Sequence, residues 1–124
     1  MEDVYLWIAA GLVLVLGWGC GFGAYALWNG APQNWPDVIA ADFVVRRTAR
    51  VLAFTSILLL ASGAACVIKV PWACEASAVA TLLFVAGGFA GNYAVFGSLR
   101  PAHTVPNVII AAVILWLLWL GYPR

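Results

Sequence analysis

Three kinds of residue in this sequence could take part in chemistry: a pair of cysteines, one histidine and one asparagine inside an apolar segment. Cys66 and Cys74 are separated by seven residues that include Pro71, so a turn could bring their sulfurs into a structural disulfide. Two buried free thiols are the alternative. Redox catalysis is disfavoured, because thiol oxidoreductases use the closer Cys-x-x-Cys spacing to lower a thiol pKa. Cys20 lies within a long apolar run and is predicted to be a small packing residue.

His103 is the only histidine and lies in a short segment between Pro101 and Pro106. It could ligate a haem or chlorin metal or bind a quinone oxygen, but a solvated loop residue is the expected state. Trp116 and Trp119 share one face of a predicted helix, where they could stack on a pigment or belong to an interfacial aromatic belt. These three residues are weak candidates for cofactor binding. No cofactor or metal site is predicted; bound lipid is expected, with a pigment or quinone as the alternative.

Asn92 is the most polar residue inside a predicted membrane span. Ionisable side chains in such spans usually mark a proton relay, an ion path or a substrate site, and none lies in the middle of an apolar segment here. An interhelical hydrogen bond is the expected role of Asn92, and a pore or solute ligand is the alternative. The sequence holds no Ser/His/Asp set and no phosphate-binding loop, so the isolated chain is not expected to be an enzyme.

Composition places these residues in a membrane protein. Hydrophobic residues make up 65% of the 124 positions and charged residues 9%, against about 25% charged residues in a soluble domain. A soluble chain of 13.2 kDa has too little interior to bury so many apolar side chains. The net charge of +1 provides no field that would attract nucleic acid, so a nucleic-acid partner is excluded.

Four uncharged segments reach or approach the length that crosses a hydrocarbon core of about 30 Å as a helix. We therefore predict a single all-α domain over residues 1–124, a bundle of four transmembrane helices. The predicted spans are residues 4–28, 48–69, 76–98 and 105–122. Glu2 and Asp3 precede the first span and no basic residue does, so a retained helix is favoured over a cleavable signal peptide.

The second helix is predicted to begin before the membrane. Residues 36–47 follow a turn-rich segment, and Pro36 suits the first turn of a helix. Asp42 and Arg46 are spaced for an i,i+4 ion pair. A helix from Pro36 to Ile68 would be about 50 Å long, more than the membrane thickness. Its start is therefore expected either to project into the cytoplasm or to bend along the interface.

Basic residues indicate the orientation in the membrane. Arg46, Arg47 and Arg50 flank the first loop and Arg100 lies in the third, whereas the second loop has only Lys69. The positive-inside rule then puts loops one and three in the cytoplasm and both termini outside. The three arginines near loop one are expected to anchor the chain at lipid headgroups, with a specific anionic ligand or partner as the alternative. A bacterial inner membrane with periplasmic termini is the expected location, and an organellar membrane is the alternative.

The first and third apolar segments resemble each other. A shift of 68 residues superposes Gly19 on Gly87 and Gly23 on Gly91, and a gapped continuation also aligns prolines of the two following segments. The chain is therefore predicted to contain two tandem two-helix units, arranged as parallel repeats about an axis along the membrane normal. Chance similarity between glycine-rich apolar segments is the alternative.

Glycines in these two segments have small-xxx-small spacing, which lets helix backbones approach closely. The predicted packing positions are Gly17, Gly19, Gly21, Gly23, Gly87 and Gly91. Residues 17 and 19 lie about 200° apart around a helix. The first helix is therefore expected to be central, with close neighbours on two sides.

Two functional hypotheses follow. The favoured one is a non-catalytic structural or accessory subunit of a larger membrane protein complex, which packs against partner transmembrane subunits and against lipids or pigments. It rests on the chemically silent spans and the glycine-rich faces. The alternative is a small oligomeric channel or transporter built from the two-helix repeats, with Asn92 as a polar group in its path. An assembly or lipid-binding factor that uses the arginines near loop one is a third option.

Overall fold

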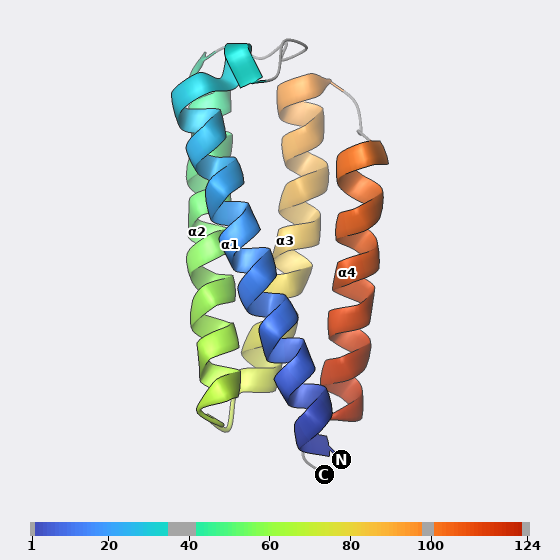
Figure 1. The fold of residues 1–124 in the computed structure, drawn as a ribbon. Coiled ribbons are helices and arrows are strands. Elements are labelled where there is room, and N and C mark those ends of the chain that lie inside the picture. Colours follow the sequence, from blue (N-terminus) through green and yellow to red (C-terminus); the bar gives the residue numbers. More distant parts are fainter. Residues whose placement is uncertain (1, 35–41, 98–100, 123–124) are drawn as a thin grey trace.

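Four helices make up the part of the chain that the structure describes, and each runs antiparallel to the next (Figure 1). The computed structural model describes the backbone of residues 2–34, 42–97 and 101–122 and the side chains of residues 4–29, 43–97 and 104–122. The helices are α1 (Glu2–Asn34), α2 (Asp42–Val67), α3 (Ala73–Phe96) and α4 (Pro101–Leu120). The prediction of an all-helical fold with four helices is confirmed.

Three of these helices are long and apolar enough to cross a membrane. The segments that meet both conditions are Val4–Asn29, Phe43–Val67 and Ala73–Phe96. The fourth apolar segment, Thr104–Leu120, is shorter, although α4 itself extends over 20 residues from Pro101 to Leu120. At 1.5 Å per residue this segment extends about 26 Å. A complete membrane crossing by α4 therefore stays a prediction.

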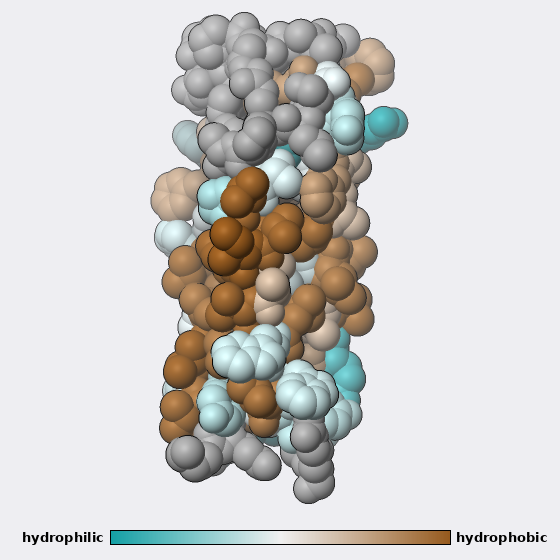
Figure 2. Space-filling model, turned by 90° about the vertical axis from the view of Figure 1, so that its right-hand side faces the viewer, coloured by the Kyte–Doolittle hydropathy of each residue, from teal (hydrophilic) through white to brown (hydrophobic). Residues whose placement is uncertain are grey.

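Large apolar side chains point outward around the middle of the bundle. Val15 on α1, Ile57 on α2, Leu82 on α3 and Ile109 on α4 are each more than half exposed. Figure 2 shows hydrophobic residues gathered along the middle of one face. Water would disfavour so much exposed apolar surface, whereas hydrocarbon accommodates it. The outer surface therefore suits a lipid bilayer.

The helices form a ring in which each packs against its neighbour in sequence and α1 also packs against α4. The start of α1 and the end of α4 lie at the same end of the bundle (Figure 1). In such a ring α1 and α3 face each other across the bundle axis. The first helix thus occupies one corner of the bundle, and not the central position expected for it.

The start of α2 is described only from Asp42 onward. Residues 36–41 of the predicted helix start lie outside the described residues, and the side chain of Asp42, with its predicted ion pair, lies outside them too. α1 continues to Asn34, past the predicted end of its span. Asn29 lies inside α1 and does not turn the chain. Its Nδ2 donates a hydrogen bond to the Tyr25 carbonyl one helical turn earlier (3.2 Å).

Two residues with positive φ shape the helix ends. Lys69 has a φ of 61° just after α2, and the backbone nitrogen of Val70 donates to the Ala65 carbonyl (3.0 Å). Gly97 has a φ of 77° and donates from its nitrogen to the Tyr93 carbonyl (3.0 Å), which ends α3. Both are hydrogen-bonded helix C-termini that contain a left-handed residue. The short turn after α2 directs α3 back along the bundle.

Glycines allow α1 and α2 to pack closely. A Cβ at Gly17 would lie 3.0 Å from the Cβ of Leu59 and 3.1 Å from the backbone nitrogen of Leu60. A Cβ at Gly21 would lie 3.0 Å from Oγ of Ser56. The Ser56 hydroxyl donates to the Gly17 carbonyl (2.7 Å), so a polar contact joins the same two backbones. This seam is a small-residue packing interface of the kind found between membrane helices.

Gly63 makes a similar close contact from the α2 side. A Cβ at Gly63 would lie 2.8 Å from both Cγ and Cδ2 of Leu14 on α1. Gly63 was not predicted as a packing residue, because the residues four positions away are Leu59 and Val67 and no small-xxx-small pattern appears. A packing glycine needs only one facing side chain, here Leu14, and the sequence around Gly63 does not indicate which side chain of another helix faces it.

One exposed hydrogen bond joins the end of α4 to the start of α3. The Tyr122 hydroxyl donates to the Glu75 carboxylate (2.6 Å) and this bond raises the pKa of Tyr122, because loss of the proton would break it beside a negative charge. A raised folded-state pKa means that the bond stabilises the fold below pH 10 and stops doing so as the pH rises through the raised value.

We therefore expect the phenolate absorbance of Tyr122, taken as the difference between wild type and Tyr122→Phe, to titrate with a midpoint above 10. Glu75→Gln should bring that midpoint back toward 10, since it removes the neighbouring charge. A wild-type midpoint at or below 10 would contradict the bond.

Candidate functional site

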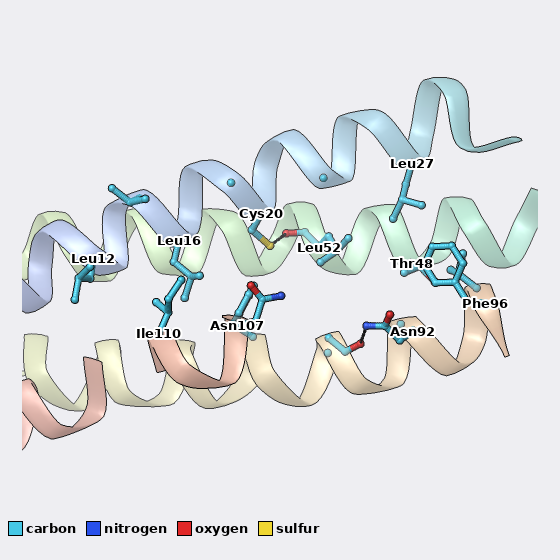
Figure 3. A pocket seen from close by; sticks show the side chains of 18 residues that line it. Leu12, Leu16, Cys20, Leu27, Thr48, Leu52, Asn92, Phe96, Asn107 and Ile110 are labelled. Atoms are coloured by element: carbon cyan, nitrogen blue, oxygen red, sulfur yellow. Dashed lines mark hydrogen bonds between the residues drawn. The ribbon is translucent and has the colours of Figure 1, made fainter. Parts of the chain in front are cut away.

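A cavity of about 450 Å³ lies between the α1/α2 hairpin and the α3/α4 hairpin (Figure 3). All four helices line it, and it is partly open to the surface. Its volume falls within the roughly 300–1,000 Å³ of sites that bind small molecules. Residues that mark its extent on each helix are Leu12 and Leu27 of α1, Thr48 and Leu52 of α2, Phe84 and Phe96 of α3, and Asn107 and Ile110 of α4.

Glycines on the two facing helices create this space. Gly19 and Gly23 of α1 and Gly87 of α3 line the cavity, and a Cβ at any of them would meet no described atom within 4 Å. The described part of the chain therefore makes no close contact at these three glycines, and their role in helix packing stays a prediction. Gly91 differs, because a Cβ there would lie 3.3 Å from Cγ2 of Thr48 on α2.

The lining follows the sequence repeat. Positions related by the shift of 68 residues line the cavity from opposite sides, since α1 and α3 face each other across the bundle axis. These pairs are Leu16 and Phe84, Gly19 and Gly87, Cys20 and Gly88, Gly23 and Gly91, and Leu27 and Val95. The cavity thus lies where the two predicted repeat units meet.

Two carboxamides interrupt the apolar lining. Figure 3 shows the side chains of Asn92 on α3 and Asn107 on α4 directed into the cavity. Asn92 Nδ2 donates to the Gly88 carbonyl of its own helix (2.7 Å), so the interhelical hydrogen bond expected of Asn92 is not made by this donor. The other end of the carboxamide, Oδ1, is buried and has no hydrogen-bond partner in the described part of the chain.

Asn107 was not predicted as a site residue. It lies six residues into α4, near the predicted interface, where an asparagine is ordinary. Thr104 lies one turn before it, and its Oγ1 is likewise buried without a partner among the described residues. Asn92, Thr104 and Asn107 all line a much smaller pocket between α3 and α4 that adjoins the cavity. Two polar residues three positions apart, Thr104 and Asn107, on an otherwise apolar helix are the signal that could have indicated this polar face of α4.

The described part of the cavity lining is uncharged. None of the described residues that line it is an aspartate, glutamate, lysine, arginine or histidine. Burial of a charged ligand would therefore lack a compensating partner on this lining, which disfavours an ion as occupant. The two carboxamides and the Thr48 hydroxyl are the main polar side chains that the cavity offers.

The predicted arginine anchors lie away from the cavity lining, at the end of the bundle where α1 ends and α2 begins. The guanidinium carbons of Arg46 and Arg50 lie 5.1 and 5.4 Å from the ring centre of Trp28, so both cations stack on one indole. Arg47 is exposed beside them. A cluster of tryptophan and arginine at a helix end is typical of the headgroup region.

Two of the three weak cofactor candidates lie away from the cavity. Trp116 and Trp119 are exposed on the outer face of α4 and do not line the cavity. The side chain of His103 lies outside the described residues. Among the side chains that are described, no three His, Cys, Asp or Glu residues are grouped as metal ligands.

Cys66 and Cys74 are free and buried, so the disulfide considered for them is not formed and the alternative of two buried thiols holds. The Cys66 sulfur lies 3.2 Å from the Ser77 hydroxyl oxygen, and that hydroxyl donates to the Ser62 carbonyl (3.3 Å). Cys66 therefore belongs to a small polar cluster between α2 and α3. Cys20 donates from its sulfur to the Leu52 carbonyl (3.2 Å) and also lines the cavity.

Alkylation tests the state of the cysteines. We expect the chain, unfolded in SDS without reductant, to gain three alkyl groups by intact mass, because Cys20, Cys66 and Cys74 are all free. A Cys66→Ser variant should gain two. A wild-type chain that gains only one group until reductant is added would show that Cys66 and Cys74 are bonded after all.

No protein-family model matches the chain, and no curated protein and no solved structure matches it either.

Proposed function

We propose that this chain is a small integral membrane protein that holds a lipid-soluble molecule between its two helical hairpins. We further propose that it does so as a non-catalytic accessory subunit of a larger membrane assembly. The observation that supports this function is the partly open cavity of about 450 Å³, with its uncharged and largely apolar lining. Such a lining suits a molecule that partitions into the bilayer, and the opening gives it a path from the lipid.

The outer face of α1 supports the subunit role. Trp18, Phe22 and Tyr25 are all strongly exposed, and the rings of Trp18 and Phe22 form an edge-to-face pair with centroids 5.6 Å apart. Their i, i+4, i+7 spacing makes one aromatic ridge along the helix. Aromatic side chains supply large contact areas in helix packing, so this ridge offers a surface to a partner transmembrane helix.

The proposed orientation follows the arginine distribution. The end of the bundle with Trp28, Arg46 and Arg50 faces the cytoplasm, and both termini face the periplasm of a bacterial inner membrane. The carboxamides of the cavity then lie in the cytoplasmic half of the bundle, because Asn92 is four residues, or about 6 Å, from the end of α3.

Native mass spectrometry of the full chain, released gently from membranes, tests both parts of the proposal. We expect a bound apolar molecule of defined mass, together with partner subunits in the larger assembly. Gly87→Leu should lose the bound molecule because the new side chain fills the cavity. Gly11→Leu is the matched control, since Gly11 has no atom near its Cβ position but does not line the cavity.

A chain that migrates alone would remove the subunit role. Equal amounts of bound molecule in the Gly87→Leu and Gly11→Leu variants would remove the cavity as the binding site. The two halves of the proposal therefore fail separately.

A small transporter or channel is the second candidate, favoured by one observation. The cavity lies between the two repeat units and is lined by equivalent positions of α1 and α3. Many transporters bind their substrates at the interface between structural repeats. This candidate predicts solute flux in liposomes that contain only this protein, abolished by Asn92→Leu. Absence of flux for ions and neutral solutes alike would rule it out.

A further inference from the structure

We infer that the cavity binds a neutral amphipathic molecule whose hydroxyl group hydrogen-bonds to Asn92 and Asn107, with its apolar body extending along α1 toward Leu12. The inference rests on the proposed function and adds the chemistry of the occupant. It is carried by three features of the cavity: a buried acceptor without a partner among the described residues, a second carboxamide that no hydrogen bond joins to the described residues, and the position of both along the cavity.

Asn92 presents an acceptor that lacks a donor. Its Nδ2 is held by the Gly88 carbonyl at 2.7 Å, which fixes the plane of the carboxamide. Its Oδ1 is buried and unpaired within the described residues. Inside a membrane no bulk water is present to satisfy such an oxygen, and leaving it unpaired is unfavourable. An occupant that carries a hydrogen-bond donor removes this penalty.

Asn107 adds a group that can both donate and accept. Its carboxamide lines the same cavity, and no hydrogen bond joins it to another side chain or backbone group of the described residues. A hydroxyl can donate to one carboxamide oxygen while it accepts from the Nδ2 of Asn107. A ketone or quinone oxygen only accepts, and it would leave Asn92 Oδ1 unpaired. A charged head group would lack a counter-charge in this lining.

The rest of the lining determines the shape and direction of the occupant. The lining on α1 extends from Leu27 past Gly23 to Leu12. The eleven helical steps from Gly23 to Leu12 correspond to about 16 Å. This stretch has apolar side chains and glycines whose missing Cβ atoms leave room for a flat or linear body. Asn92 lies four residues, or about 6 Å, from the end of α3, whereas Asn107 lies nearer the middle of the bundle and Leu12 lies in its other half. An amphipathic molecule would thus lie along the helices, with its hydroxyl group in the half of the bundle that contains the end of α3.

Photolabelling of the full chain in bilayer nanodiscs tests this inference. The probe is a long-chain primary alcohol with a diazirine in its tail, and the matched probe is its methyl ether, which keeps the oxygen but cannot donate. We expect the alcohol to label wild type about tenfold more than the ether at equal concentration, as measured by intact mass. Peptide mapping should place the label on cavity-lining residues of α1 or α3.

Two asparagine variants test the head-group contacts independently. Asn92→Leu should lower labelling by the alcohol toward that by the ether and leave labelling by the ether unchanged, because only the alcohol can donate to Asn92 Oδ1. Asn107→Leu, on a different helix, should lower labelling by both probes, because either oxygen can accept from Asn107 Nδ2. Gly87→Leu should abolish cavity labelling by both probes, and Gly11→Leu should abolish neither. Circular dichroism checks that each variant keeps its helices.

The outcomes separate the inference from the proposed function. Equal labelling by the two probes, unchanged in both asparagine variants, would overturn the hydroxyl preference while the cavity kept its role. Labelling by both probes that persists in Gly87→Leu would overturn the cavity as a binding site, and the proposed function with it. Loss of the preference in Asn92→Leu with labelling by the ether intact, together with lower labelling by both probes in Asn107→Leu, is the result that supports the inference.

Discussion

Replacement of Gly17 by leucine is expected to destabilise the bundle by about 3 kcal/mol, the upper part of the usual range for overpacking. A Cβ at this position would already lie 3.0 Å from the Leu59 Cβ and 3.1 Å from the Leu60 backbone nitrogen. Neither atom is the end of a flexible side chain, so the clash can be relieved only by moving the helices apart. Separation of α1 from α2 would also stretch the hydrogen bond from Ser56 to the Gly17 carbonyl.

Gly19→Leu is the matched control for this prediction. Gly19 lies two residues further along the same helix, and a Cβ there would meet no described atom within 4 Å. We expect its free energy of unfolding, measured by SDS titration in mixed micelles, to change by less than about 1 kcal/mol, because surface substitutions away from packed contacts have small effects. If the two leucine variants were equally stable, α1 and α2 would not pack through Gly17.

The contrast between Gly17 and Gly19 also shows where prediction from the sequence stops. Both glycines belong to a small-xxx-small pattern, and the pattern correctly predicts an unusual lack of side-chain bulk on both faces of α1. It does not tell whether that lack is used for helix contact or for open space. α1 is apolar all round, so no polar face indicates which side looks toward the core. Only the positions of the other helices distinguish the packing glycines from the cavity glycines.

The number and type of helices were predictable because hydrophobic length alone determines them. The predicted spans overlap α1, α2 and α3 but do not give the helix ends, since polar residues extend α1 to Asn34. The pairing of Cys66 was not predictable, because spacing along the chain does not fix the rotation of a helix. In the structure that rotation directs Cys66 to Ser77, 3.2 Å away.

One of the two asparagines that line the cavity was predicted from the sequence. Asn92 stood out because it is polar in the middle of a glycine-rich apolar segment. Asn107 did not, because it lies beside Pro106 in a stretch that resembles a helix start at the interface. The two became one site only when α3 and α4 were placed side by side. A contact between distant segments is set by tertiary packing, and local patterns carry little information about it.

The second large effect is expected at Gly63, from the opposite side of the α1/α2 seam. Gly63→Ala should cost about 2 kcal/mol, because its Cβ would lie 2.8 Å from Cγ and Cδ2 of Leu14. Leu14→Ala removes those two carbons and, at a half-buried position, should cost about 1 kcal/mol by itself. Since the clash and the void occupy the same place, the two changes should compensate each other.

We therefore expect the double variant, Gly63→Ala with Leu14→Ala, to be more stable than the sum of the single variants predicts, by about 1.5 kcal/mol. The control cycle combines Gly63→Ala with Leu82→Ala, an outward-facing leucine of α3, and should be additive within about 0.5 kcal/mol. Additivity in both cycles would mean that Leu14 and Gly63 are not in contact. A coupling confined to the Leu14 cycle would fix the rotation of α1 against α2. With that rotation fixed, Gly19 and Gly23 must face away from α2, which is the condition for the cavity to exist.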